Sequence, residues 1–133
     1  MTVERDYLMV KGVGTDIVDV ARIGAVLSRQ GDAFVTRVLA VSEQPAYHTS
    51  QQKPSFMAKR FAAKEAVAKA LGTGIGNGVS FQDIVISHDT LGAPMVSLSG
   101  GAQTVMSQLG ATRVFLSIAD EKDYALAFAT ITA

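Results

Sequence analysis

The chain has 133 residues and a mass of 14.0 kDa, which is enough for one domain with a real core but too little for two. Lys plus Arg and Asp plus Glu balance at 12 each, so no global basic field indicates nucleic acid, and the absence of cysteine excludes disulfides and thiolate metal sites. No apolar run reaches the length of a membrane span, so we expect a soluble, cytoplasmic protein. A hydrophobic fraction of 48% is high for a small monomer and favours self-association.

The chain begins with a predicted strand and helix. Residues 7–20, "YLMVKGVGTDIVDV", are apolar and β-branched, which predicts a strand that is broken by glycines and ends near Asp16. Asp19 is suited to cap a helix over residues 20–30, whose apolar spacing is helical, and Gly31 ends that helix.

Three more helices are predicted before the glycine-rich segment, over residues 32–40, 42–51 and 56–71. Ser42 is a candidate cap for the second of them, where Pro45 is tolerated only near the first turn. Pro54 and Ser55 open the third and longest helix.

Strand patterns dominate the rest of the chain, over residues 79–87, 94–99, 111–120 and 123–132. The segment between the first two has a turn composition, the last two read as a hairpin around "DEKD", and residues 100–110 read as an amphipathic helix. Helices and strands are mixed without strict alternation. We therefore expect one α+β domain, in which an antiparallel sheet packs with helices.

The glycine-rich segment, residues 72–78, reads "GTGIGNG". It does not have the dinucleotide fingerprint, because its spacing differs and it follows a helix instead of a strand. It also lacks the lysine of a P-loop. Two readings stay open: a loop that offers backbone N–H groups to a phosphate, or a helix C-cap that turns into the next strand.

Glu65 is the one carboxylate of the long, alanine-rich helix. It could be a solvated residue paired with Lys69 one turn on. At 100° per residue, however, Glu65 and Lys69 lie beside Ala58 and Ala62, which predicts a shallow alanine-lined surface with room for a magnesium-bound phosphate. Arg60 and Lys64 of the same helix project from a different face than Glu65 and Lys69.

Asp16 is the natural second ligand for such a metal. It lies within an apolar run, where an unpaired buried carboxylate would be costly. Magnesium is commonly held by one or two carboxylates together with substrate phosphates and water. A capping role at the end of the strand is the alternative.

A stripe of Arg22, Val26 and Arg29 follows the first predicted helix at spacings of four and three. Such a stripe can dock an acidic helix, although it can equally be a solvated face. His48 and His88 lie in polar, loop-like surroundings without metal-ligand spacing, and we assign neither a role.

Two motifs together carry a family resemblance: "GVGTDIVDVARI" at residues 12–23 and "RFAAKEAVAKALGTGI" at residues 60–75. With the "LGAP" turn and the "LSIADEKDYALAFA" ending, the chain resembles holo-acyl-carrier-protein synthase, the small bacterial 4'-phosphopantetheinyl transferase, over residues 9–133. Residues 1–8 would be an extension. The resemblance implies a compact α+β subunit and a homotrimer with active sites between neighbours.

The resemblance also implies roles for individual residues. Asp16 and Glu65 fall on the metal-binding positions, for Mg²⁺, and Lys69 on a lysine that meets coenzyme A phosphate and assists the chemistry. The implied coenzyme A contacts are Arg60, Lys69, Gly72, Thr73, Gly74 and Ile75, and the implied carrier-protein contacts are Arg22, Val26 and Arg29. Asp120 stands where many members have histidine, so no histidine is assigned as base there.

The implied reaction transfers 4'-phosphopantetheine from coenzyme A to a serine of apo acyl carrier protein, in fatty acid biosynthesis. A metal-ordered water near Asp16 or Glu65 is our candidate for the general base. The competing class is a coenzyme A or nucleotide sensor that transfers nothing. A sensor would keep the glycine loop and Arg60 but has no reason to keep both acids.

Overall fold

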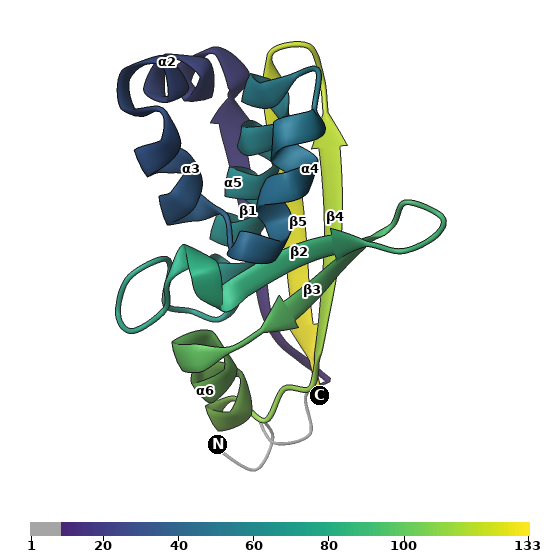
Figure 1. The fold of residues 1–133 in the computed structure, drawn as a ribbon. Coiled ribbons are helices and arrows are strands. Elements are labelled where there is room, and N and C mark those ends of the chain that lie inside the picture. The colour runs from purple at the N-terminus through teal and green to yellow at the C-terminus, as the bar shows by residue number, and fades with distance from the viewer. Residues whose placement is uncertain (1–8) are drawn as a thin grey trace.

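The computed structural model describes residues 9–133, so the predicted extension at residues 1–8 lies outside it. Strands and helices follow one another along the chain (Figure 1): β1 Val10–Asp19, α2 Val20–Gln30, α3 Asp32–Val38, the 3₁₀ turn Val41–Glu43, α4 Gln44–Thr49, α5 Lys53–Ala70, the 3₁₀ turn Phe81–Asp83, β2 Ile84–His88, β3 Pro94–Leu98, α6 Gly100–Gln108, β4 Arg113–Asp120 and β5 Tyr124–Thr132.

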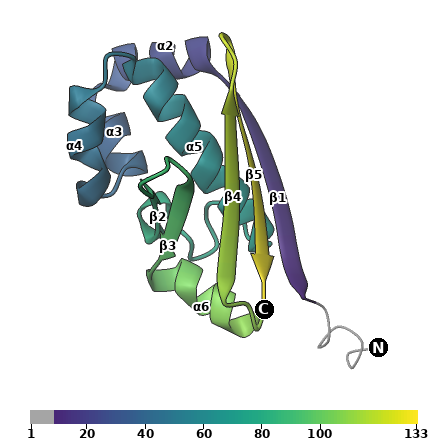
Figure 2. The same ribbon diagram turned by 90° about the vertical axis from the view of Figure 1, so that its right-hand side faces the viewer.

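The strands form a three-stranded antiparallel sheet in the order β1-β5-β4 and a two-stranded antiparallel sheet, β2-β3. The helices and the smaller sheet lie on one side of the three-stranded sheet (Figure 2). Helix α5 packs against β1 and β5, and its buried alanines fill the layer between helix and sheet. This arrangement confirms the α+β class and the antiparallel sheet packed with helices.

Strand β1 runs through to Asp19, so the predicted end near Asp16 was wrong. Gly12 and Gly14 do not break the strand. A Cβ at Gly12 would collide with the carbonyl oxygen of Ala70, and one at Gly14 with that of Ala66, both on α5. The two glycines therefore let β1 lie directly against the helix.

The N-terminal cap of α2 is as predicted, because the Asp19 carboxylate accepts a hydrogen bond from the N–H of Ala21 at 2.9 Å. Ser42 does not cap α4. The N-cap residue of α4 is Glu43, which makes no side-chain capping bond to that helix. Its carboxylate accepts from the N–H of Ala40 at 2.8 Å, at the start of the preceding 3₁₀ turn. Pro45 lies in the first turn of α4, as expected.

Two predicted boundaries shift for local reasons. Helix α5 begins at Lys53, so that Pro54 lies in its first turn, where a missing N–H costs no hydrogen bond. Residues 79–83 are not strand, because Ser80 and Asp83 form a capping box around a 3₁₀ turn and β2 starts only at Ile84. Within residues 9–133, no helix is long and apolar enough to cross a membrane.

Candidate functional site

Three charged side chains converge where β1 lies against α5. Lys69 of α5 donates from Nζ to Oδ1 of Asp16 at 2.8 Å and to the carbonyl of Thr15 at 3.0 Å. The Lys69 side chain is 48% exposed and that of Asp16 is 15% exposed. Glu65, one turn before Lys69, lines the same cavity as Asp16. We call Asp16, Glu65 and Lys69 the open cluster.

The structure decides between the sequence alternatives for these residues. Lys69 pairs with Asp16 of β1, whereas no ion pair joins it to Glu65 among the described residues. Asp16 is not a strand-end cap, because it lies within β1 opposite Ala127 of β5 and Asp19 caps α2. The two carboxylates that the sequence suggested as a pair do share one cavity.

The first cavity has a volume of about 480 Å³ and lies between β1, α2, α3 and α5. Carboxylates and arginines stand beside apolar side chains along its wall: Asp16, Ile17, Val18, Asp19, Arg22, Ile23, Val26, Gln30, Phe34, Arg37, Phe61 and Glu65. The cavity therefore offers both charged and apolar contacts to a ligand.

The predicted alanine-lined surface around Glu65 is wrong. Ala58 and Ala62 are both 0% exposed and belong to the core. Phe61, one turn before Glu65, lines the cavity with it. The i, i+4 spacing of these two residues is the sequence signal that could have identified Phe61.

Burial raises the pKa of the Glu65 carboxyl, the nearby Asp16 raises it further, and Lys69 lowers it. The two carboxylates therefore repel each other, and a cation between them would relieve that repulsion. Among residues 9–133 no group of three or more His, Cys, Asp or Glu side chains could hold a metal. Two carboxylates suffice for Mg²⁺ when substrate phosphates and water complete its ligands.

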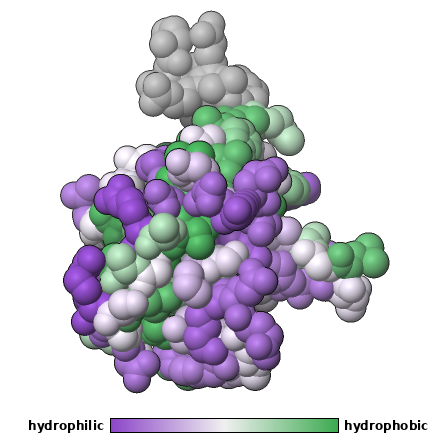
Figure 3. All heavy atoms as spheres, turned by 90° about the horizontal axis from the view of Figure 1, so that it is seen from above, coloured by the Kyte–Doolittle hydropathy of each residue, from purple (hydrophilic) through white to green (hydrophobic). Residues whose placement is uncertain are grey.

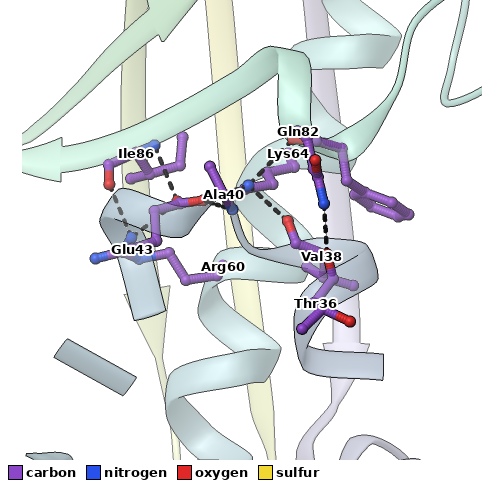
Figure 4. Close-up of polar contacts among 9 residues, drawn as sticks. Thr36, Val38, Ala40, Glu43, Arg60, Lys64, Gln82 and Ile86 are labelled. Carbon is purple, nitrogen blue, oxygen red and sulfur yellow. Dashed lines mark hydrogen bonds and ion pairs between the residues drawn. The ribbon is translucent and has the colours of Figure 1, made fainter. Parts of the chain in front are cut away.

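A second charged cluster lies in the interior, on the other side of α5. Glu43 accepts from Nζ of Lys64 at 2.6 Å and from Nη1 of Arg60 at 2.9 Å (Figure 4). Lys64, which is 0% exposed, also donates to the carbonyls of Val38 and Phe81, and burial lowers its pKa. We call Glu43, Arg60 and Lys64 the buried triad.

Arg60 therefore projects from a different face of α5 than Glu65, as the helical spacing predicted. It lines a second cavity of about 370 Å³, which also receives Lys59, His88 and Asp120. The Arg60 guanidinium stacks on the Phe56 ring at 4.8 Å and donates to the carbonyl of Ile86 at 2.8 Å. Sequence reasoning missed Lys59, and it placed His88 in a loop, whereas His88 ends β2.

The glycine-rich loop acts as a helix C-cap. The N–H groups of Thr73 and Gly74 donate to the carbonyl of Ala68, and the N–H of Gly72 donates to the backbone carbonyl of Lys69. Gly72 and Gly74 have φ of 86° and 64°, which side chains disfavour. Of the two readings left open, the cap accounts for these glycines, and these three N–H groups are not free for a phosphate. Ile75 is half-buried beside the core.

The arginine stripe of α2 divides between cavity and surface. Arg22 and Val26 line the first cavity, whereas Arg29 is exposed in the last turn and does not line it. The end of the molecule that carries α2 is mostly hydrophilic, with smaller apolar patches (Figure 3). Phe34 and Arg37 of α3 line the same cavity, and no pattern in the sequence indicates this.

Known proteins resemble this chain over most of its length. Residues 12–129 match the model of the 4'-phosphopantetheinyl transferase superfamily. Holo-acyl-carrier-protein synthase of Shewanella amazonensis is 54% identical over 124 residues, which are 93% of this chain and 99% of that protein. The crystal structure of the Neisseria meningitidis synthase has 42% identity and a TM-score of 0.88, covering 94% of this chain and all of that one. The Helicobacter pylori synthase, solved in complex with coenzyme A, has 35% identity and a TM-score of 0.80, covering 90% and 99%.

Proposed function

Because the chain belongs to the 4'-phosphopantetheinyl transferase superfamily, we propose that it is a holo-acyl-carrier-protein synthase. It transfers 4'-phosphopantetheine from coenzyme A to a serine of apo acyl carrier protein, in the cytoplasm and for fatty acid biosynthesis. The observation that carries the proposal is the pair of carboxylates, Asp16 and Glu65, on one cavity, with Lys69 bonded to Asp16, in a fold shared with a relative solved in complex with coenzyme A.

We propose that Asp16 and Glu65 hold Mg²⁺. The pair is suited to a hard cation because both groups are carboxylates, and because Asp16 raises the pKa of Glu65. When bound, the ion would supply positive charge to the pyrophosphate of coenzyme A. Lys69 adds a half-exposed ammonium that is already fixed by Asp16 and the Thr15 carbonyl.

In the proposed reaction, the carrier serine oxygen bonds to the β-phosphorus of coenzyme A and the bond to the bridging oxygen breaks. Adenosine 3',5'-bisphosphate leaves with the electron pair of that bond. The serine proton passes to a water held by Asp16 or Glu65. Lys69 neutralises negative charge that grows on the leaving phosphate, so positioning and electrostatics carry most of the catalysis.

The subunit is proposed to act as a trimer. One face of the three-stranded sheet is turned away from the helices (Figure 2). Strand alternation and register place five exposed apolar side chains on that face: Val13 and Ile17 of β1, Phe115 of β4, and Leu126 and Phe128 of β5. Five exposed apolar side chains on one sheet face are well suited to an interface.

A trimer would also join two parts of the substrate site. Asp16 lies on β1 and Asp120 on β4, which are opposite edges of the sheet. A heterologous interface in a closed ring sets one surface of a subunit against a different surface of the next, so in the proposed ring the β1 side of one subunit would meet the β4 side of its neighbour. This supports Arg60, beside Asp120 in the second cavity, as a contact for a coenzyme A phosphate at a site between subunits.

Light scattering tests the assembly. The unmodified chain should have the mass of three subunits, and Phe128→Lys should shift it to the monomer with loss of transfer, because a charge would be buried in the interface. A fully active monomer would contradict the trimer. Thr104→Lys, on the exposed surface of α6, is the matched control.

Helix α2 is the proposed docking site for the acidic carrier. Arg22 and Val26 border the cavity that holds Asp16 and Glu65, so a carrier bound there would place its serine beside both acids. Arg29 would contribute long-range attraction from the exposed end of the helix.

Incubation with apo carrier, coenzyme A and Mg²⁺ tests the function. The intact mass of the carrier should increase by one phosphopantetheine, and adenosine 3',5'-bisphosphate should appear in equal amount. A coenzyme A sensor, the alternative class, would bind coenzyme A and leave the carrier unchanged. That result would refute the proposed transfer.

A further inference from the structure

The wall of the second cavity carries two basic side chains, Lys59 and Arg60, and one carboxylate, Asp120. Glu43 balances only one of the two cations that it contacts, since Arg60 and Lys64 both bond to it. The cavity is therefore suited to an anion.

His88 lines this cavity at the end of β2, where its backbone is held in the two-stranded sheet. The backbone of His88 pairs with Pro94 of β3. The turn that follows is closed by the Asp89 carboxylate, which accepts from the N–H groups of Leu91 and Ala93, each at 2.9 Å. The imidazole itself makes no hydrogen bond with residues 9–133, so both ring nitrogens are available to a ligand.

We propose that His88 is a coenzyme A contact that gains a proton when a phosphate group of the substrate enters the second cavity. The inference rests on the proposed function, because it takes coenzyme A as the ligand. Binding would thus take up a proton from solution, and the affinity for coenzyme A would increase as the pH falls.

The charges around His88 favour proton uptake on binding. Partial burial lowers the pKa of His88, as do Arg60 and Lys59 of α5, whereas Asp89 raises it. Asp120 of β4 faces the same cavity. The lowered pKa favours the neutral imidazole in the free protein. A phosphate beside the ring would offset the two cations and favour the protonated form, whereas burial, the largest cause of the lowered pKa, remains.

Calorimetric titration of the full chain with coenzyme A tests the proposal, in two buffers of different ionisation enthalpy at each pH. The unmodified chain should take up protons, His88→Asn should take up markedly fewer, and the matched control His48→Asn should equal the unmodified chain. The His88→Asn variant should also raise KM for coenzyme A about tenfold at pH 6 but little at pH 8, with kcat nearly unchanged.

Other outcomes of the same titrations would overturn either the role of His88 or the proposed function. Equal proton uptake and equal KM in His88→Asn and the unmodified chain would overturn the role of His88 while leaving the transfer reaction intact. Failure of the unmodified chain to bind coenzyme A would overturn the proposed function as well. Dephospho-coenzyme A identifies the group involved: loss of proton uptake assigns it to the 3'-phosphate, and retention assigns it to the pyrophosphate.

Discussion

Helix α5 carries a charged cluster on each of two faces, and both clusters combine carboxylates with basic side chains. In the buried triad, Glu43 accepts from two backbone N–H groups and from both cations, so its hydrogen bonds are complete. In the open cluster, Lys69 bonds to Asp16, while Glu65 makes no hydrogen bond with the described residues. The saturated carboxylate of the triad has no bond left for a ligand, whereas the carboxylate of Glu65 does.

Arg60 belongs to the buried triad and also lines the second cavity. Its Nη1 is committed to Glu43 and to Ile86, yet the side chain lines the second cavity. The triad therefore fixes a cation at the edge of a cavity. Glu43 can matter for substrate binding without touching the substrate.

The largest expected effect is on stability, from Glu43→Gln. Two buried cations would lose their carboxylate, and breaking such a pair lowers the free energy of unfolding by about 3–5 kcal/mol. Denaturant unfolding measures this. Glu121→Gln, an exposed acid in the β4–β5 turn, is the control and should stay within about 0.5 kcal/mol. A loss below about 1 kcal/mol for Glu43→Gln would mean that the triad is not essential to the fold.

The next effect is on activity, from Asp16→Asn. An amide is a neutral and weaker ligand for Mg²⁺, so carrier modification should slow by about 100-fold or more across Mg²⁺ concentrations. Stability should fall by less than about 1 kcal/mol, because Lys69 is half exposed and its pairing is screened by solvent. Wild-type rates in this variant would remove Asp16 from the metal site.

The two clusters differ in how well the sequence predicts them. Capping and turn residues predicted most elements, and helical spacing correctly separated Arg60 and Lys64 from Glu65. The role of Glu43 was not predictable, because its partners lie 17, 21 and 43 residues away along the chain. Only the packed fold brings them together.

Glycines and alanines were misread for the same reason. The apparent strand breaks at Gly12 and Gly14 are sites where β1 touches α5, and the supposed surface alanines, Ala58 and Ala62, are core. Small residues permit either close packing or an open surface, and local sequence does not distinguish the two. Phe61, by contrast, was within reach of the spacing argument.

A smaller effect separates the two arginines of α2. Arg22→Ala should raise the apparent KM for the carrier several-fold and Arg29→Ala less, because Arg22 alone of the two borders the cavity. The double variant should also make the reaction less sensitive to salt and leave coenzyme A affinity near that of the unmodified chain. If coenzyme A affinity falls while carrier dependence is unchanged, this face binds the nucleotide.

The smallest expected effect is a pH-dependent gain in stability. Folding raises the pKa of Glu65, so its ionised form costs stability above that pKa, and the cost disappears as the pH falls through it. With chelator present, Glu65→Gln should therefore be more stable than the unmodified chain at pH 8, by less than about 1 kcal/mol, and equal to it at pH 4. A less stable variant at pH 8 would show that ionised Glu65 is favourably bonded.

The division between the two faces of α5 is tested most directly by the turnover of Glu65→Gln per folded molecule. We expect a folded protein, with an unfolding midpoint at pH 8 at or above that of the unmodified chain, that modifies the carrier about 100-fold more slowly or not at all. Turnover near that of the unmodified chain would contradict it, since Glu65 would then be a solvated helix residue and the open cluster would not be the catalytic site.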